Sequence, residues 1–173
     1  MAESWLEMQC RCTPRVFEHL TVDYMLFHED MAFKNGPMIG PKLFEEFMKP
    51  YYDSLIAHLR SYGQSRFLLD SDGQNGPVLD CFIDVGINGL FPFEVAAGYD
   101  IRQARQRHPD FFIWGGIDKR VLLQGKDAIQ REVLEKIPPV WETGGFIPAI
   151  DHSIPPCPRE HFEYFLNLVR SLF

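Results

Sequence analysis

Ionisable side chains follow five short apolar segments of the chain. These groups are His28-Glu29-Asp30, Asp70-Ser71-Asp72, Glu94, Asp118-Lys119 and Asp151-His152. Carboxylate and imidazole groups can hold a cation, transfer a proton or orient a substrate. If the apolar segments are parallel strands, all five groups lie at one edge of the sheet, where α/β proteins place their active sites. Helix capping is the structural alternative, and it accounts best for Asp100 and Asp118.

Asp70 and Asp72 are two residues apart, so in extended backbone their side chains point to the same side. Two carboxylates this close need a bound cation, a shared proton or a basic neighbour before both can ionise. His152 is a candidate for that neighbour, and it can equally serve as a neutral metal ligand or as a general acid–base group. His28 also stands beside acids, so both histidines are candidates for the site.

The elements that position these groups are predicted from apolar runs and helical spacing. The runs show no alternation, which is typical of parallel strands buried on both faces, and amphipathic stretches between them supply the helices. No alternating polarity predicts hairpins. We therefore predict a helix within residues 1–20 and strands at residues 22–27, 67–69, 87–93, 111–114 and 146–150. This pattern predicts an α/β fold with a parallel sheet, in a single domain over residues 1–173.

The composition limits the class of protein. Lys and Arg number 17 against 24 Asp and Glu, so the net charge is −7. Without a basic cluster, such a chain is poorly suited to bind nucleic acid or an anionic membrane surface. Its apolar runs are much shorter than the roughly 20 residues of a transmembrane helix. The first residues carry acids where a secretory signal has positive charge, so we predict a cytoplasmic protein.

Four of the segments resemble a known family. The sequences HEDMAFKNGP (28–37), DSDG (70–73), GGIDK (115–119) and DHSIPP (151–156) are similar to the C-terminal half of the uroporphyrinogen decarboxylase superfamily, which includes cobalamin-dependent methyltransferases. The resemblance spans residues 20–173. It implies the C-terminal portion, about five βα units, of a TIM (β/α)8 barrel with its site at the carboxyl ends of the strands. It also implies that this chain lacks the N-terminal half, which carries the decarboxylase's catalytic Asp and anion-binding arginines.

The resemblance assigns roles to individual residues. His152 matches the histidine that decarboxylase members carry after the last strand. Asp70, Asp72 and His152 stand where methyltransferase members bind zinc through one histidine and two cysteines, and this harder ligand set suits Mg, Mn or Fe. We therefore predict a divalent metal on Asp70, Asp72 and His152, and catalytic roles for His152, Asp70, Asp72 and Glu94. The predicted substrate-binding residues are His28, Glu29, Asp30, Asp118 and Lys119.

Three functions are compatible with this resemblance. The first is a corrinoid-linked, methyltransferase-like enzyme with a small-molecule substrate and a corrinoid protein as partner. The second is uroporphyrinogen decarboxylation, a lyase reaction of porphyrin biosynthesis, whose substrate carboxylates need cations; the nearby candidates are Lys34, Lys119 and Arg120. The third is a non-catalytic half-barrel or one half of a split protein. Such a half would form a homo-oligomer or pair with a complementing N-terminal half chain, since five strands leave an eight-stranded barrel open. Whether the chain is an enzyme by itself stays open.

Overall fold

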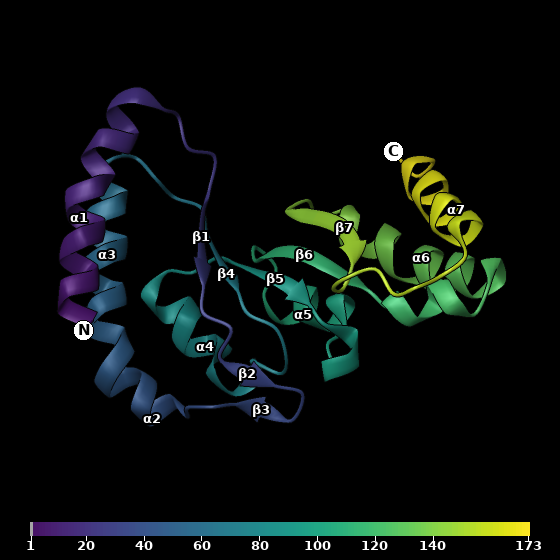
Figure 1. The fold of residues 1–173 in the computed structure, drawn as a ribbon, viewed down its shortest axis with the longest axis horizontal. Helices are drawn as coiled ribbons and strands as arrows, with labels where there is room; N and C mark the ends of the chain where they lie inside the picture. The colour runs from purple at the N-terminus through teal and green to yellow at the C-terminus, as the bar shows by residue number, and fades with distance from the viewer. Residues whose placement is uncertain (1) are drawn as a thin grey trace.

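Parallel strands form the centre of the molecule. The computed structural model describes residues 2–173, and in it each strand lies beside the next in the order β1, β4, β5, β6, β7 (Figure 1). Their bounds are Met25–His28, Phe67–Asp70, Gly89–Phe93, Phe112–Ile117 and Phe146–Ile150. Every neighbouring pair in this order is parallel. The predicted α/β fold with a parallel sheet is therefore confirmed, although the first strand begins and ends later than predicted.

The strand order shows how the sheet is wound. Each new strand is added at the same edge without a reversal of order, and right-handed crossovers of this kind place the connecting helices on one face. A doubly wound sheet would instead reverse its order and carry helices on both faces. The winding is therefore that of a barrel wall. The helices are α3 (Lys49–Ser61), α4 (Gly76–Val85), α5 (Ile101–Arg107), α6 (Lys126–Trp141) and, after the last strand, α7 (Arg159–Arg170).

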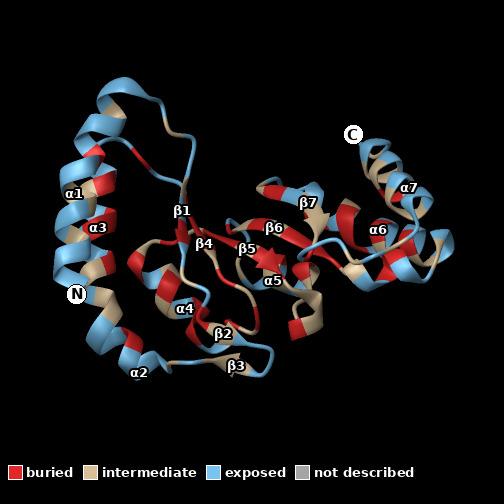
Figure 2. Ribbon diagram, in the orientation of Figure 1, coloured by how far each residue is buried: buried red, intermediate tan, exposed pale blue. Residues whose placement is uncertain are grey.

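The core lies between the strands and these helices. Figure 2 shows deeply buried segments along the central strands and on the inward sides of the helices. Phe82 of α4 packs edge-on against Phe44 and Tyr52, with ring centroids 4.7 Å and 5.6 Å away. Full burial of such an apolar side chain contributes about 1.5 to 3 kcal/mol. This aromatic cluster holds α3 and α4 in place behind the ends of β1 and β4.

The N-terminal helix matches the predicted one, and the helix before β4 is divided. α1 (Ala2–His19) packs beside α3, with Phe17 stacked on Tyr62 at 5.5 Å between ring centroids (Figure 1). The stretch that begins with α2 (Pro41–Leu43) continues as a π-helical turn, η1 (Phe44–Met48), before α3. None of the helices within residues 2–173 has the length and apolarity needed to span a bilayer.

The segment after β1 contains a hairpin that the sequence did not predict. It pairs β2 (Ala32–Phe33) with β3 (Gly36–Pro37) in antiparallel fashion. Each strand is two residues long, which is too short for the alternation by which hairpins are recognised. The N–H of Gln74 donates to the carbonyl of Phe33 at 2.9 Å, so the hairpin covers the loop that follows β4.

The sheet face opposite the helices is partly uncovered. Leu26 of β1 is 41% exposed and Ile147 of β7 is 42% exposed. Between them, Trp114 packs on Phe91 with ring centroids 4.7 Å apart. Within residues 2–173, β1 and β7 are the edges of the sheet, and each pairs on one side. The described chain therefore presents an open barrel wall with an apolar inner face.

Candidate active site

β1 and β4 end side by side on a histidine and an aspartate. His28 and Asp70 are the last residues of their strands and are paired in register. They lie on the inner face because Phe27 and Leu69, one residue earlier, are buried toward the helices. The Nδ1 atom of His28 lies 3.0 Å from Oδ2 of Asp70. This hydrogen bond and the charge of Asp70 raise the pKa of His28, and the charges of Asp30 and Asp72 act in the same direction.

His152 and Asp72 link two loops across the mouth of the sheet. The Nε2 atom of His152 lies 2.9 Å from Oδ2 of Asp72. These residues follow β7 and β4, which have β5 and β6 between them. At about 4.8 Å per strand, a flat sheet would separate the two strands by about 14 Å. The two loops therefore bend toward each other over the intervening strand ends, which places both residues at the mouth as predicted.

Glu94 and Lys119 connect the strand ends between these pairs. Glu94 follows β5, and its Oε2 accepts the N–H of Gly73 at 3.0 Å. Its Oε1 lies 3.8 Å from Nζ of Lys119, which follows β6. Both side chains are about four-fifths buried, at 19% and 23% exposure. Because Glu94 balances its charge, the ammonium group of Lys119 is not available as an unpaired cation for an anionic substrate.

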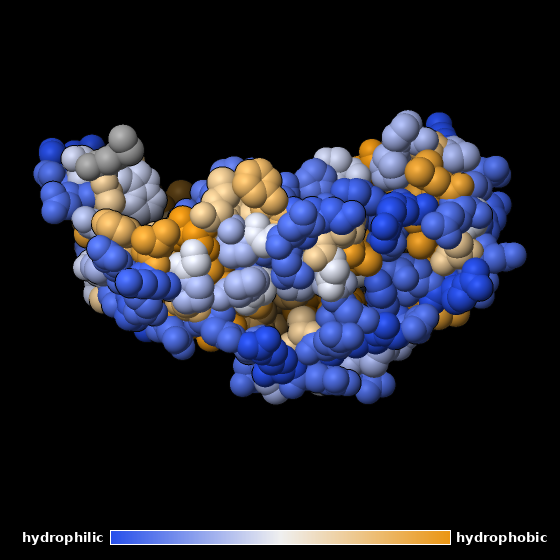
Figure 3. Space-filling model, turned by 90° about the horizontal axis from the view of Figure 1, so that it is seen from below, coloured by the Kyte–Doolittle hydropathy of each residue, from blue (hydrophilic) through white to orange (hydrophobic). Residues whose placement is uncertain are grey.

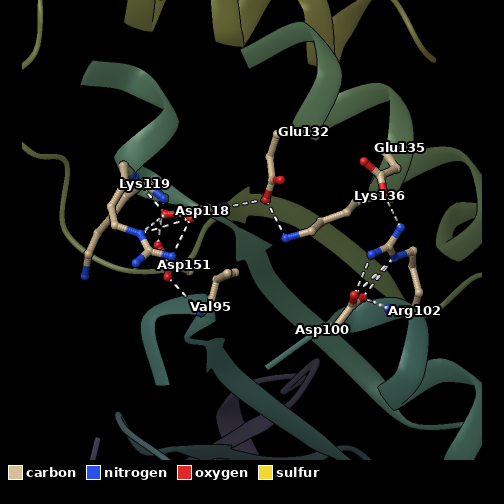
Figure 4. Close-up of polar contacts among 10 residues, drawn as sticks. Val95, Asp100, Arg102, Asp118, Lys119, Glu132, Glu135, Lys136 and Asp151 are labelled. Carbon is tan, nitrogen blue, oxygen red and sulfur yellow. Dashed lines mark hydrogen bonds and ion pairs between the residues drawn. The ribbon is translucent and has the colours of Figure 1, made fainter. Parts of the chain in front are cut away.

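Asp151 is a fully buried carboxylate beneath the mouth. Its Oδ2 accepts the N–H of Val95 at 2.8 Å, and its Oδ1 accepts the N–H of Lys119 at 3.0 Å (Figure 4). Val95 begins the 3₁₀ turn η2 (Val95–Ala97) after β5, and Lys119 begins η3 (Lys119–Leu123) after β6. One carboxylate thus ties the ends of three strands together beside His152. The sequence placed Asp151 among the strand-end acids without giving it a role.

Asp118 behaves as the capping alternative predicts. It accepts the N–H of Arg120 at 2.9 Å and also pairs with the guanidinium of that residue. Burial acts to raise the pKa of Asp118, but the hydrogen bonds from Arg120 outweigh it and hold the pKa below its usual range. Glu132 accepts the N–H of Asp118 and pairs with the buried Lys136 (Figure 4). Asp118 is part of the scaffold, and its substrate contact stays a prediction.

Glu29 and Asp30 are not brought together with His152 and Asp72. The carboxylate of Glu29 takes a hydrogen bond from the hydroxyl of Tyr52 in α3. The side chain of Glu29 points toward the helices because successive side chains alternate between the two faces of a strand and that of His28 lies on the inner face. Burial raises the pKa of Glu29, against the opposing effect of the Tyr52 hydrogen bond. Asp30 is exposed and has a φ of 39°.

The sequence analysis missed two buried polar residues that shape the loop after β4. Ser71 accepts the N–H of Met31 at 3.2 Å and donates to Oδ1 of Asn75 at 3.0 Å. The side-chain amide of Asn75 donates to the carbonyls of Ser71 and Asp72 at 2.9 and 3.1 Å. Residues of these types commonly bond to nearby backbone in turns, which is the signal that could have found them. Together they fix the position of Asp72.

Asp70 and Asp72 each bond to a different histidine. Asp70 bonds to His28, whereas Asp72 bonds to His152. Within residues 2–173, no group of three His, Cys, Asp or Glu side chains is arranged to hold a metal ion. The metal site on Asp70, Asp72 and His152 stays a prediction. Two oriented histidine–aspartate pairs in one mouth are suited to proton transfer and to positioning of a ligand.

Comparison with known proteins gives the family. Residues 24–172 match the family model described as Uroporphyrinogen decarboxylase (URO-D), and no curated protein matches the chain significantly. Among solved structures, a methyltransferase from Methanosarcina mazei is similar at a TM-score of 0.63 and 19% identity, over 96% of this chain and 47% of that one. The chain thus spans about half the length of this structural relative, and the predicted portion of a TIM barrel is confirmed. The chain belongs to the uroporphyrinogen decarboxylase family.

Proposed function

We propose that this chain is part of a corrinoid-linked methyltransferase in which His28, oriented by Asp70, transfers a proton. The observation that carries the proposal is the 3.0 Å hydrogen bond from Nδ1 of His28 to Asp70 on a side chain that is 74% exposed. Nε2 of His28 has no hydrogen-bond partner among residues 2–173 and is therefore available to a substrate. An aspartate on Nδ1 with a reactive Nε2 is the arrangement by which other enzymes make histidine an acid–base catalyst. The fold shared with a methyltransferase supports the reaction class.

Methyl transfer joins the methyl carbon to an acceptor atom, and a protonated acceptor such as a thiol must lose its proton in the process. His28 accepts this proton at Nε2, and the carboxylate of Asp70 stabilises the charged imidazole that results. A bound methylcorrinoid would supply the methyl group and would retain the electron pair of the bond that breaks.

His152 and Asp72 act as positioning residues in this proposal. Both ring nitrogens of His152 are engaged, since Nε2 bonds to Asp72 and Nδ1 accepts the N–H of Ser153 at 2.6 Å. The predicted catalytic role therefore moves from His152 to His28, which the sequence had assigned to substrate binding. We route no step through a divalent metal: Asp72 and His152 bond to each other, and Asp70 bonds to His28.

His28→Gln should lower the rate of methyl transfer by about 10²- to 10⁴-fold, the usual contribution of a general acid–base group. The assay uses the complete barrel, that is, residues 1–173 together with the remainder of the family fold. It follows the absorbance change as methylcobalamin transfers its methyl group to a thiol. His19→Gln, on the exposed face of α1, is the matched control. An unchanged rate for His28→Gln would rule out the proton-transfer role, and an inactive completed barrel would rule out methyl transfer.

Asp70→Asn gives a second readout of the same pair, because it should lower the pKa of His28 toward 6.5 in an NMR titration. The sign follows from linkage. A raised folded-state pKa adds stability below the unfolded pKa, and that stability is lost as the pH rises through the folded pKa. The stability effect is small because His28 is exposed. An unshifted His28 pKa would show that the pair does not form.

The open sheet points to a completing segment as partner. A cavity of about 210 Å³ on the inner face is lined by Tyr24, Leu68, Trp114 and Ile147 among others. Eight strands close a barrel of this type, so we infer that three further βα units cover this face and pair with β1 and β7. They come from the remainder of the family fold, either in the same polypeptide or as a separate chain.

Residues 1–173 expressed without the remainder should self-associate through these edges and this face. Light scattering after gel filtration measures the mass, and Leu26→Lys should shift it toward that of the monomer. Leu123→Lys, at an exposed position of η3 on the helical side, is the control. A stable monomer of the unmodified chain would contradict the inferred completion.

Uroporphyrinogen decarboxylation ranks below methyl transfer because two of the three nearby cations are already paired. Lys119 faces Glu94, and Arg120 is held by Asp118. A substrate with many carboxylates needs unpaired arginine or lysine groups at the mouth. Incubation of the completed barrel with the porphyrinogen, followed by product analysis, decides between the two reactions.

A further inference from the structure

A cavity lies beside the mouth, between the first turns of α1, the end of β1 and the junction of η1 with α3. Its volume is about 470 Å³, within the range of about 300 to 1,000 Å³ that is typical of small-molecule sites. Figure 3 shows hydrophobic surface beside this end of α1, at the left of the view. Its polar lining includes His28 and Glu29. The apolar and aromatic walls are Trp5, Phe47, Met48, Tyr51 and Tyr52.

The π-helical turn η1 supplies two of these walls. Pro50 has no N–H to donate to the carbonyl of Glu46, and the helix widens at this point: the N–H of Lys49 donates to the carbonyl of Phe44, five residues back. Phe47 and Met48 line the cavity from this turn, and Phe47 is 60% exposed. Single π-turns within α-helices occur frequently at functional sites. An apolar ligand part would cover the exposed ring of Phe47.

Glu29 brings a negative charge to this aromatic cavity. Its carboxylate takes a hydrogen bond from Tyr52, and partial burial makes its ionised form costly, which raises its pKa. The neighbouring His28 is hydrogen-bonded to Asp70; its charged form acts to lower the pKa of Glu29, but burial has the larger effect and the pKa is raised. A positively charged ligand would compensate the buried carboxylate, whereas an anion would be repelled.

We propose that this cavity binds a small N-methylated ammonium cation, with its methyl groups against Trp5, Phe47 and Tyr51 and its charge near Glu29. The faces of aromatic rings carry partial negative charge and attract such cations. A neutral apolar ligand of the same shape would displace water from Glu29 without replacing its interactions. The proposal goes beyond methyl transfer and does not depend on it, since it concerns binding.

Choline and its uncharged analogue 3,3-dimethyl-1-butanol test the proposal, because they share a shape and differ in charge. In calorimetric titrations of the chain, choline should bind at least about tenfold more tightly than the alcohol. Glu29→Gln keeps an acceptor for Tyr52 but removes the charge, and it should weaken choline binding about five- to thirtyfold, as should Trp5→Leu. Equal affinity for the two ligands, or no binding of choline, would overturn the proposal.

Trp141→Leu is the matched control for Trp5→Leu. The two tryptophans are similarly exposed, at 43% and 40%, and Trp141 packs on Phe173 at the far end of the molecule. Its variant should bind choline as the unmodified chain does, and circular dichroism shows whether each variant is folded. A folded Glu29→Gln variant with unchanged affinity would also refute the proposal. Because the titration needs no methyl transfer, its failure is distinct from a failure of the proposed reaction.

Discussion

Replacing Asp151 with alanine should lower the free energy of unfolding by about 3 to 5 kcal/mol. The Asp151 carboxylate is fully buried and accepts the N–H groups of Val95 and Lys119. Alanine would leave both donors without a partner, at a cost of about 1 to 3 kcal/mol each. It would also release the ends of β5 and β6 from β7, so His152 would lose its fixed position at the mouth.

Asp151→Asn separates charge from shape in this test. Its amide oxygen keeps one hydrogen bond while its NH₂ group faces the other N–H, so the loss should be about 1 to 3 kcal/mol. Ser153→Ala, at an exposed position two residues later, should stay within about 0.5 kcal/mol of the unmodified chain. Urea unfolding of the same protein preparation measures all three variants. An Asp151→Ala variant as stable as the unmodified chain would show that these bonds do not hold the strand ends.

Replacing Gly73 with alanine should lower the free energy of unfolding by about 2 to 4 kcal/mol. Gly73 has a φ of 77°, which L residues rarely adopt, and a Cβ there would lie 2.5 Å from the backbone carbonyl oxygen of Ala32 in the hairpin. The backbone of Ala32 cannot move aside as the end of a flexible side chain can. The β2–β3 hairpin and the loop after β4 must therefore move apart. The bond from the N–H of Gly73 to Glu94 would weaken, and Asp72 would move from His152.

Gly63→Ala measures the backbone strain alone, so the difference between the two variants gives the steric part of the effect. Gly63 has a similar φ of 85°, but a Cβ there would meet no atom of the described residues within 4 Å. Its cost should therefore be the backbone strain, about 1 kcal/mol. Thermal unfolding of both variants gives the difference, and a crystal structure of Gly73→Ala shows whether the Asp72–His152 bond survives. Equal costs would mean that the hairpin does not pack tightly on the loop.

The strands were predictable because their signal is local. The run of buried residues Phe67, Leu68 and Leu69 ends at Asp70, and such apolar runs closed by polar residues mark parallel strands without reference to the rest of the chain. The gathering of acids and histidines at one edge then follows from parallel direction. Asp100 and Asp118 cap the turns that follow them, as predicted, since capping depends on neighbours two residues away.

The local features that were missed have short or ambiguous signals. The hairpin of β2 and β3 is two residues per strand, below the length at which alternation is visible. Pro50 indicates an interrupted helix, but a kink, a break and a π-turn are all compatible with its missing N–H. Packing of Phe44 against Phe82 accompanies the π-turn.

The sequence by itself determined the α/β class, the strand positions and the presence of carboxylates and imidazoles at the strand ends, since these depend on burial of apolar runs and on nearby polar residues. Only the tertiary structure decided which groups meet. His28 and Asp70 pair over 42 residues because their strands are neighbours in register, and His152 reaches Asp72 over 80 residues because the loops bend across the mouth. Such contacts depend on strand order and sheet curvature, which no local pattern encodes. For that reason the sequence left three ways to offset the repulsion between Asp70 and Asp72, namely a bound cation, a shared proton or a basic neighbour. The fold places a separate histidine beside each of them.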